Sequence, residues 1–140
     1  KNIFLKPHPS ENIKYYKSVS RRLKKENNLI KSYDKNIKFE DVINQSKILV
    51  CTDPETTFNL SMLSGVPTIL LIDKNILELL NPKFTVLIKE LIKSKILFCD
   101  YYNASKHINK IADNPYEWYN LENVKKTRMK FLKLSFGLNK

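Results

Sequence analysis

The chain has 140 residues, the size of one ordinary domain, and 42% of them are hydrophobic, which is enough to bury a single core without disulfides or metal ions. The formal charge of +11 comes almost entirely from lysine, since only Arg21, Arg22 and Arg128 are arginines, and no aromatic residues interleave with a basic stripe; both features argue against a nucleic-acid-binding protein. The apolar runs are too short to span a bilayer. Two cysteines without a disulfide framework fit a reducing cytoplasm, and dispersed lysines favour the anionic inner face of the cytoplasmic membrane.

Short apolar segments alternate with amphipathic segments along the chain. The expected strands are Asn2–Lys6, Lys47–Cys51, Thr68–Ile72 and Ile96–Phe98. The expected helices are Ser10–Lys25, Phe39–Gln45, Asp53–Ser64, Phe84–Lys93, Asn103–Ala112, Pro115–Asn120 and Val124–Phe136. Apolar strands separated by helices are typical of a parallel sheet covered on both faces, so the predicted fold class is α/β, a Rossmann-like parallel sheet flanked by helices.

Several single residues carry local predictions. Asp53 is expected to cap the helix over residues 53–64, with Pro54 at its first position, and Gly65 is expected to end it. Cys51 and Cys99 each close an apolar run, which indicates buried thiols at strand ends. Trp118, Tyr116 and Tyr119 are expected to pack the C-terminal helices onto the sheet, whereas His107 is expected at the surface of its helix.

The organisation indicates one domain over residues 1–140. The first expected strand begins almost at the first residue, so we expect this domain to be a piece of a longer two-domain protein.

Ligands of open parallel sheets bind beyond the carboxyl ends of the strands, which directs attention to the loops over residues 6–10, 52–57 and 73–75. In the first loop, Pro7 and Pro9 hold the His8 imidazole near a helix start that Ser10 can cap, where it can donate to a phosphate oxygen. The alternative is a solvated loop histidine. We expect all three loops to open on one edge of the sheet.

In the second loop, Thr56 and Thr57 lie in the first turn of a helix, where hydroxyls and unpaired backbone N–H groups form a cradle for an anion. The alternative is simple capping by Asp53, with both threonines as bystanders. Glu55 can accept hydrogen bonds from ribose hydroxyls. The sequence contains no G-x-G-x-x-G, Walker, C-x-x-C or G-x-S-x-G motif, and nothing in it indicates a metal site or a nucleophile.

These motifs, taken in order, resemble the donor domain of GT-B glycosyltransferases. The resemblance rests on Lys6-Pro7-His8-Pro9-Ser10, on the Thr56-Thr57-Phe58 helix start, and on Ser64-Gly65-Val66-Pro67-Thr68 entering a strand. Residues 96–98, 104–109 and 117–119, with Phe131 in the final basic helix, are similar to bacterial surface-carbohydrate transferases of the O-antigen and capsule type. The likeness covers nearly the whole chain and implies the C-terminal half of a GT-B fold.

The His-Pro pair also resembles that of sialic acid and Kdo transferases, which use CMP-activated sugars. This resemblance implies that His8 and Pro9, with Ser10 beside them, and Thr56 and Thr57 contact the donor phosphate, with His8 as the catalytic residue. Asp53 and Glu55 depart from the pattern, since carboxylates repel a phosphate. No cofactor or metal is implied beyond the nucleotide-sugar co-substrate.

The partners that the resemblance implies are a nucleotide-sugar donor, a glycan or lipid-linked acceptor, and an N-terminal acceptor domain outside this chain that supplies the catalytic base. Two other functions fit the same motifs. One is a phosphotransferase domain that uses CDP-glycerol or CDP-ribitol, and the other is a non-catalytic interaction domain with the same fold.

Overall fold

The computed structural model describes residues 2–6, 21–23, 25–34, 36–79 and 82–137. The chain divides into two compact units, residues 1–44 and 45–140. The prediction of a single domain, a fragment of a longer protein, stays a prediction.

The first unit contains a pair of parallel strands, β1 (Ile3–Leu5) and β2 (Ile30–Ser32), with Ile3 opposite Ile30. The backbone N–H of Ile3 donates to the Leu29 carbonyl over 3.1 Å. Helix α2 (Phe39–Gln45) has the predicted bounds. Strand β2 was not predicted, and most of the helix expected over residues 10–25 lies outside the described residues.

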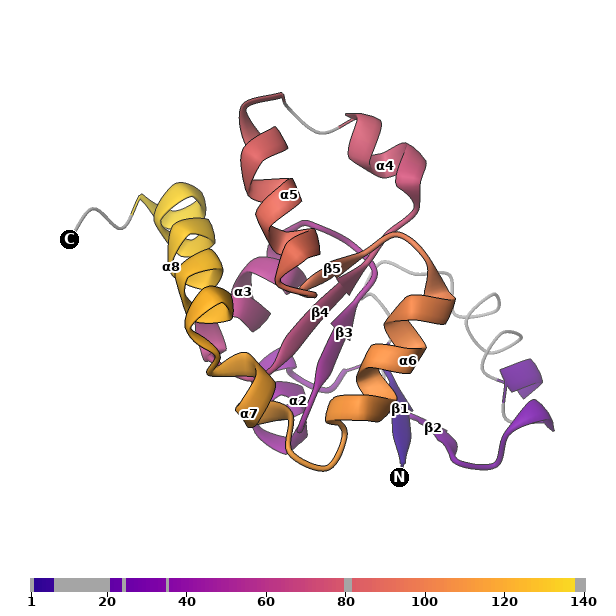
Figure 1. The fold of residues 1–140 in the computed structure, drawn as a ribbon. Helices are drawn as coiled ribbons and strands as arrows, with labels where there is room; N and C mark the ends of the chain where they lie inside the picture. The colour runs from indigo at the N-terminus through magenta and orange to yellow at the C-terminus, as the bar shows by residue number, and fades with distance from the viewer. Residues whose placement is uncertain (1, 7–20, 24, 35, 80–81, 138–140) are drawn as a thin grey trace. The chain divides into compact units, whose positions relative to one another are not determined.

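The second unit is built on three parallel strands in the order β3-β4-β5 (Figure 1). The strands are β3 (Leu49–Cys51), β4 (Thr68–Leu71) and β5 (Leu97–Phe98). The helical elements are α3 (Thr56–Ser64), α4 (Lys74–Leu79), the 3-10 turn η1 (Pro82–Phe84), α5 (Thr85–Lys93), α6 (Tyr101–Ile111), α7 (Pro115–Tyr119) and α8 (Glu122–Phe136). This is the predicted α/β class with a Rossmann-like parallel sheet flanked by helices.

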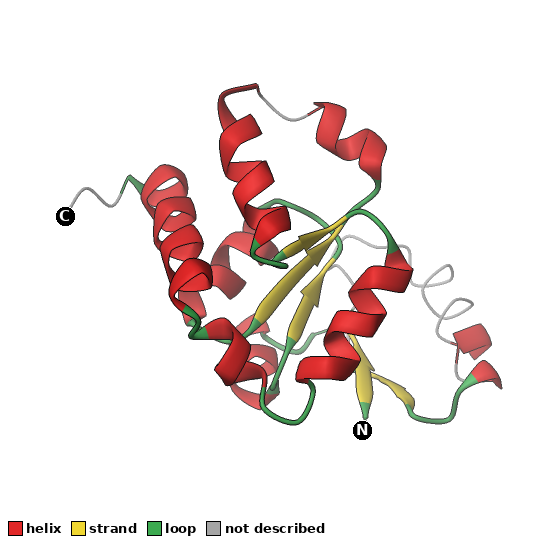
Figure 2. Cartoon of the chain, in the orientation of Figure 1, coloured by secondary structure: helices red, strands yellow, loops and turns green. Residues whose placement is uncertain are grey.

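Helices cover the three strands on both sides. In Figures 1 and 2, α6 lies on one side of β3, β4 and β5, and α5 and α8 lie on the other. Ile69 of the central strand is fully buried, as are Met62 of α3 and Ile96 before β5. A central strand packed on both faces needs an uninterrupted apolar sequence, which explains why the run that forms β4 was readily predicted.

Trp118 and Tyr119 pack as predicted: Trp118 Nε1 donates to the Ser94 carbonyl over 3.2 Å, and Tyr119 is fully buried. The Arg128 guanidinium lies 3.7 Å from the Tyr119 ring centre, which adds a cation–π contact between α7 and α8. Tyr116 is 45% exposed, so the prediction that it packs with them is wrong.

The bounds of α3 correct one prediction and confirm another. The helix begins at Thr56 rather than at Asp53, because the Asp53 carboxylate accepts the Glu55 N–H over 2.8 Å and closes a turn before the helix. Gly65 ends the helix in the left-handed conformation, with φ of 77°, as predicted. Residues 74–79, expected in a loop, form α4. Asp73 precedes this helix, and its Oδ1 accepts the Asn75 N–H in a similar hydrogen bond.

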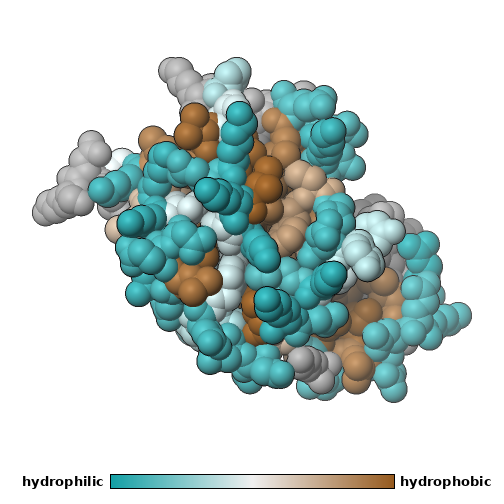
Figure 3. All heavy atoms as spheres, in the orientation of Figure 1, coloured by the Kyte–Doolittle hydropathy of each residue, from teal (hydrophilic) through white to brown (hydrophobic). Residues whose placement is uncertain are grey.

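Hydrophilic residues cover much of the visible face of the molecule, and apolar residues show between them in separate areas (Figure 3). Within the described ranges, no helix is long and apolar enough to cross a membrane.

Candidate functional site

The loop after β3 and the first turn of α3 form the first candidate site. Glu55, Thr56 and Thr57 are consecutive and exposed, and the Glu55 side chain makes no capping hydrogen bond. The first N–H groups of an α-helix have no carbonyl partner within the helix, so this turn presents backbone donors beside two threonine hydroxyls. The turn therefore offers several hydrogen-bond donors to an anion.

The turn is held in place by the buried face of α3. Phe58, 1% exposed, meets the Phe131 ring of α8 edge-on at 5.1 Å between ring centres. Ser61 is buried, donates to the Thr57 carbonyl over 2.8 Å, and lies 3.5 Å from the sulfur of Cys51 in β3. These contacts fix the first turn of α3 at the carboxyl end of β3.

The thiols differ in their surroundings. Burial raises the pKa of the Cys51 thiol, which is enclosed as predicted. Cys99 is only partly buried, because it lies just beyond the end of β5. Both are free thiols.

The structure brings together only part of the predicted site. Glu55, Thr56 and Thr57 lie side by side on the α3 turn. His8, Pro9 and Ser10 lie outside the described residues, so their approach to this turn stays a prediction. The segment at residues 73–75, which was expected to be a loop and instead includes the start of α4, follows β4, which is parallel to β3. It therefore lies at the same edge of the sheet as the α3 turn.

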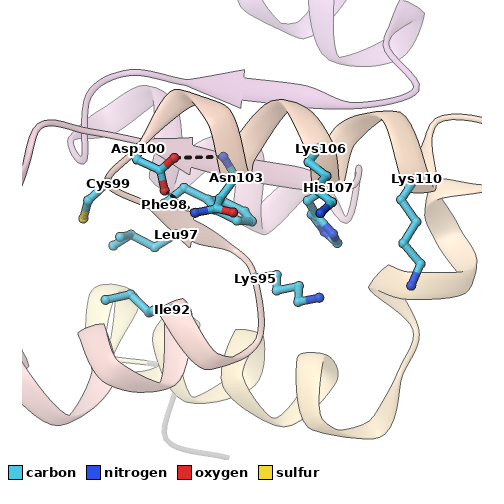
Figure 4. A pocket seen from close by; sticks show the side chains of 10 residues that line it. All are labelled: Ile92, Lys95, Leu97, Phe98, Cys99, Asp100, Asn103, Lys106, His107 and Lys110. Carbon is cyan, nitrogen blue, oxygen red and sulfur yellow. Dashed lines mark hydrogen bonds between the residues drawn. The ribbon is translucent and has the colours of Figure 1, made fainter.

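A second candidate site, which the sequence did not predict, is a cleft of about 650 Å³ between the end of α5, strand β5 and α6 (Figure 4). Leu97 and Phe98 contribute apolar surface, and Lys95, Lys106 and Lys110 contribute charge. At the other end of the cleft, the Asp100 carboxylate accepts from both the backbone and the side-chain N–H groups of Asn103, at 2.8 Å each. These bonds lower the pKa of Asp100.

His107 lines this cleft, and the prediction that it lies at the surface is wrong. Its side chain is 7% exposed and sits between Phe98 and Trp118, with ring centres 5.5 and 4.8 Å away. The cause is its position on α6, where Ala104, His107 and Ile111 form the buried stripe. Burial, together with the nearby charges of Lys95 and Lys110, lowers its pKa to about 4.

Within the described part of the chain, no group of three or more His, Cys, Asp or Glu side chains is arranged to hold a metal ion. Both candidate sites suit an anion. The first offers hydrogen-bond donors, and the second offers the positive charge of lysines.

A family model described as "LIC12162 family transferase" matches residues 1–135. The chain belongs to the LIC12162 transferase family. The match spans almost the whole chain, including both candidate sites, and makes this LIC12162 family member a transferase. No curated protein and no solved structure matches the chain.

Proposed function

We propose that this chain is the donor-binding half of a GT-B glycosyltransferase, which binds a nucleotide-activated sugar for the synthesis of a bacterial surface polysaccharide. The observation that carries the proposal is the exposed first turn of α3, with Thr56 and Thr57, at the carboxyl end of β3 in a parallel sheet. Nucleotides bind at that edge in folds of this class. Membership of a transferase family supports an activity that moves a group from an activated donor.

The chemistry of such a site is the stabilisation of charge on the departing nucleotide. When the bond between the sugar and the phosphate breaks, negative charge develops on the phosphate oxygens. Donors fixed in advance on a helix turn stabilise that charge without reorganising. In this proposal the α3 turn binds the phosphate, Glu55 accepts from the ribose hydroxyls, and His8 donates to the phosphate as the catalytic residue.

A CMP-linked sugar is the favoured donor, on the strength of the His8-Pro9 pair and the Thr56-Thr57 pair. Asp53 opposes this placement less than its charge suggests, because its carboxylate accepts the Glu55 N–H. Glu55 remains the departure from the pattern. The acceptor, a glycan or a lipid-linked sugar, and the catalytic base belong in this proposal to an N-terminal domain outside this chain.

The first experiment is a thermal-shift and calorimetric titration of the chain with CMP, CDP, UDP and GDP. A ligand present at one hundred times its dissociation constant stabilises the native state by about 2.7 kcal/mol, which such a measurement resolves. We expect CMP to stabilise the chain most, and both His8→Ala and the double variant Thr56→Ala/Thr57→Ala to lose this effect.

The matched control is the double variant Ser105→Ala/Ser135→Ala, which removes two exposed hydroxyls from α6 and α8. It should bind CMP as the unmodified chain does. Preference for UDP or GDP would keep the nucleotide site and reject CMP, preference for CDP would favour the glycerol or ribitol phosphotransferase, and binding of none would contradict the proposal.

The same proposal places the enzyme at the inner face of the cytoplasmic membrane as a peripheral protein. Its support is the exposed face of α8, where Lys125, Lys126 and Lys133 accompany Met129 and Leu134, which are 54% and 55% exposed. Lysines beside exposed apolar side chains suit a surface of anionic lipids.

A further inference from the structure

The cleft beside His107 contains a polar group that the fold leaves unused. Neither His107 Nδ1 nor Nε2 has a hydrogen-bond partner, and both nitrogens are shielded from solvent. A buried polar atom without a partner costs about 1–3 kcal/mol, so such atoms are rare in folded proteins and call for an explanation. An aromatic or aliphatic residue would fill the space between Phe98 and Trp118 without this cost.

Three lysines line the same cleft as this imidazole, and the charges of Lys95 and Lys110 act on it. They are Lys95, Lys106 and Lys110, and no ion pair involves them within the residues that the structure describes (Figure 4). The acidic group of the cleft, Asp100, lies at its far end and is engaged with Asn103. The field around His107 is therefore positive.

Lys95 reaches this position at a conformational cost. It ends α5 in the left-handed region, with φ of 62°, where the Lys95 and Ile96 N–H groups donate to the carbonyls of Ile92 and Leu91. Glycine is the usual residue at such a helix end. A lysine here supplies a charge to the cleft that glycine would not.

We propose that the basic end of this cleft binds a phosphate group, with the three lysines pairing with its oxygens and the His107 imidazole donating one hydrogen bond. The lysine side chains are long and exposed, and His107 itself lines the cleft. A phosphate beside the ring favours the imidazolium and gives one of the two buried ring nitrogens a partner.

This site is distinct from the proposed donor site. Lys95 precedes β5, so the basic end of the cleft lies at the amino end of that strand, whereas the α3 turn follows the carboxyl end of the parallel strand β3. The two sites therefore lie at opposite ends of the parallel strands. The phosphate at His107 is a second one, carried either by a soluble phosphate ester or by a lipid headgroup.

The experiment is an NMR titration of the labelled chain with inorganic pyrophosphate, against sodium chloride of equal ionic strength. We expect saturable shifts of the amides of Lys95, Lys106, His107 and Lys110, and a rise in the pKa of His107 as followed by its ring protons. The triple variant Lys95→Gln/Lys106→Gln/Lys110→Gln should bind pyrophosphate at least about tenfold more weakly, which corresponds to the loss of roughly 1.4 kcal/mol.

The matched control is Lys125→Gln/Lys126→Gln/Lys133→Gln, which removes the same charge from α8 and should change the affinity by less than about twofold, since these lysines act only through a screened field. His107→Phe keeps an aromatic ring between Phe98 and Trp118 and should weaken binding while the chain stays folded. Equal weakening by both triple variants, or shifts confined to Thr56 and Thr57, would overturn the proposal, and the second result would still support the donor site.

Vesicles of phosphatidylcholine with and without phosphatidylglycerol identify the source of the phosphate. If the phosphate belongs to a lipid, the anionic vesicles displace pyrophosphate from the cleft and the neutral vesicles do not. If it belongs to a soluble ester, pyrophosphate binds the cleft and the cleft variant binds vesicles as the unmodified chain does. The absence of a specific response to either probe would reject the site.

Discussion

His107 is held neutral by its surroundings. Its ring lies between Phe98 and Trp118, and the charges that face it are those of Lys95, Lys106 and Lys110, with Asp100 and Cys99 farther along the cleft. Burial and the lysines lower its pKa from 6.5 to about 4. Protonation of this ring therefore opposes folding.

The stability of the chain should fall with acidification because of this residue. Between pH 6.5 and about 4 the unfolded chain takes up a proton at residue 107 that the folded chain does not, so the free energy of unfolding decreases as the pH falls through this window. The loss should reach on the order of 2–3 kcal/mol and level off below about pH 4. Urea denaturation of the unmodified chain and of His107→Phe across this range measures the difference, and parallel pH profiles would contradict the assignment.

The predicted positions of single residues were correct where the local sequence pattern determines the conformation. Thr56 and Thr57 lie in the first turn of a helix, as predicted, although this helix begins at Thr56 and not at Asp53. The burial of His107 was missed because histidine is usually exposed, although its spacing from Ala104 and Ile111 is that of a buried helical stripe. The role predicted for Asp53 was wrong, because its carboxylate closes a turn before the helix and does not cap the helix itself.

The end of α3 determines how that helix leads into β4. Gly65 adopts φ of 77°, and the Ser64 hydroxyl accepts the Val66 N–H over 3.2 Å just beyond it. A methyl group added at Gly65 would have the Arg128 guanidinium nitrogen 4.0 Å away as its nearest neighbour, which is ordinary contact distance. The need for glycine here is therefore conformational and not steric.

Gly65→Ala should lower the free energy of unfolding by about 1–2 kcal/mol, because an L-residue in the left-handed region carries that strain. Gly65→Asn is the matched control, and it should lose less, since asparagine tolerates this conformation. Chemical denaturation of the three proteins gives the comparison. Equal losses for alanine and asparagine would instead indicate crowding against Arg128.

Elements with a strong local pattern were predicted, whereas β2 and α4, whose local patterns are weak, were not. The apolar run of β4 and the helices α2 and α7 were located within a residue or two. Strand β2 was missed because Ile30-Lys31-Ser32 has one apolar residue, and its conformation depends on pairing with β1 far away in sequence. Helix α4 was missed because it is short and follows a turn-forming Asp73.

The formal net charge of +11 belongs to the molecule as a whole and attracts it to anionic surfaces. A protein with this charge accumulates at an anionic surface over distances longer than any single contact. The exposed face of α8 adds apolar side chains to that attraction, as described above. Association with membrane should therefore depend on both salt and this helix.

We expect the chain to sediment with vesicles that contain phosphatidylglycerol, to be released by added salt, and not to sediment with pure phosphatidylcholine. Lys125→Gln/Lys126→Gln/Lys133→Gln should weaken this binding by tenfold or more, on the basis of about 1 kcal/mol for each lysine near the surface. The cleft triple variant has the same net charge and serves as the control. An equal loss in both would mean that net charge alone, and not α8, directs the association.

The shortness of strand β5 affects whether copies of this chain can pair along the outside of the sheet. This strand is one of the two outer strands of the described three-stranded sheet and is only two residues long. Lys95 lies two residues before it, and Asp100, which caps α6, lies two residues after it. Aggregation through sheet edges needs a longer row of free backbone groups, and a lysine at the rim discourages it further. At β5 the sheet therefore offers a neighbouring molecule almost no strand to extend, which disfavours pairing between copies along this strand.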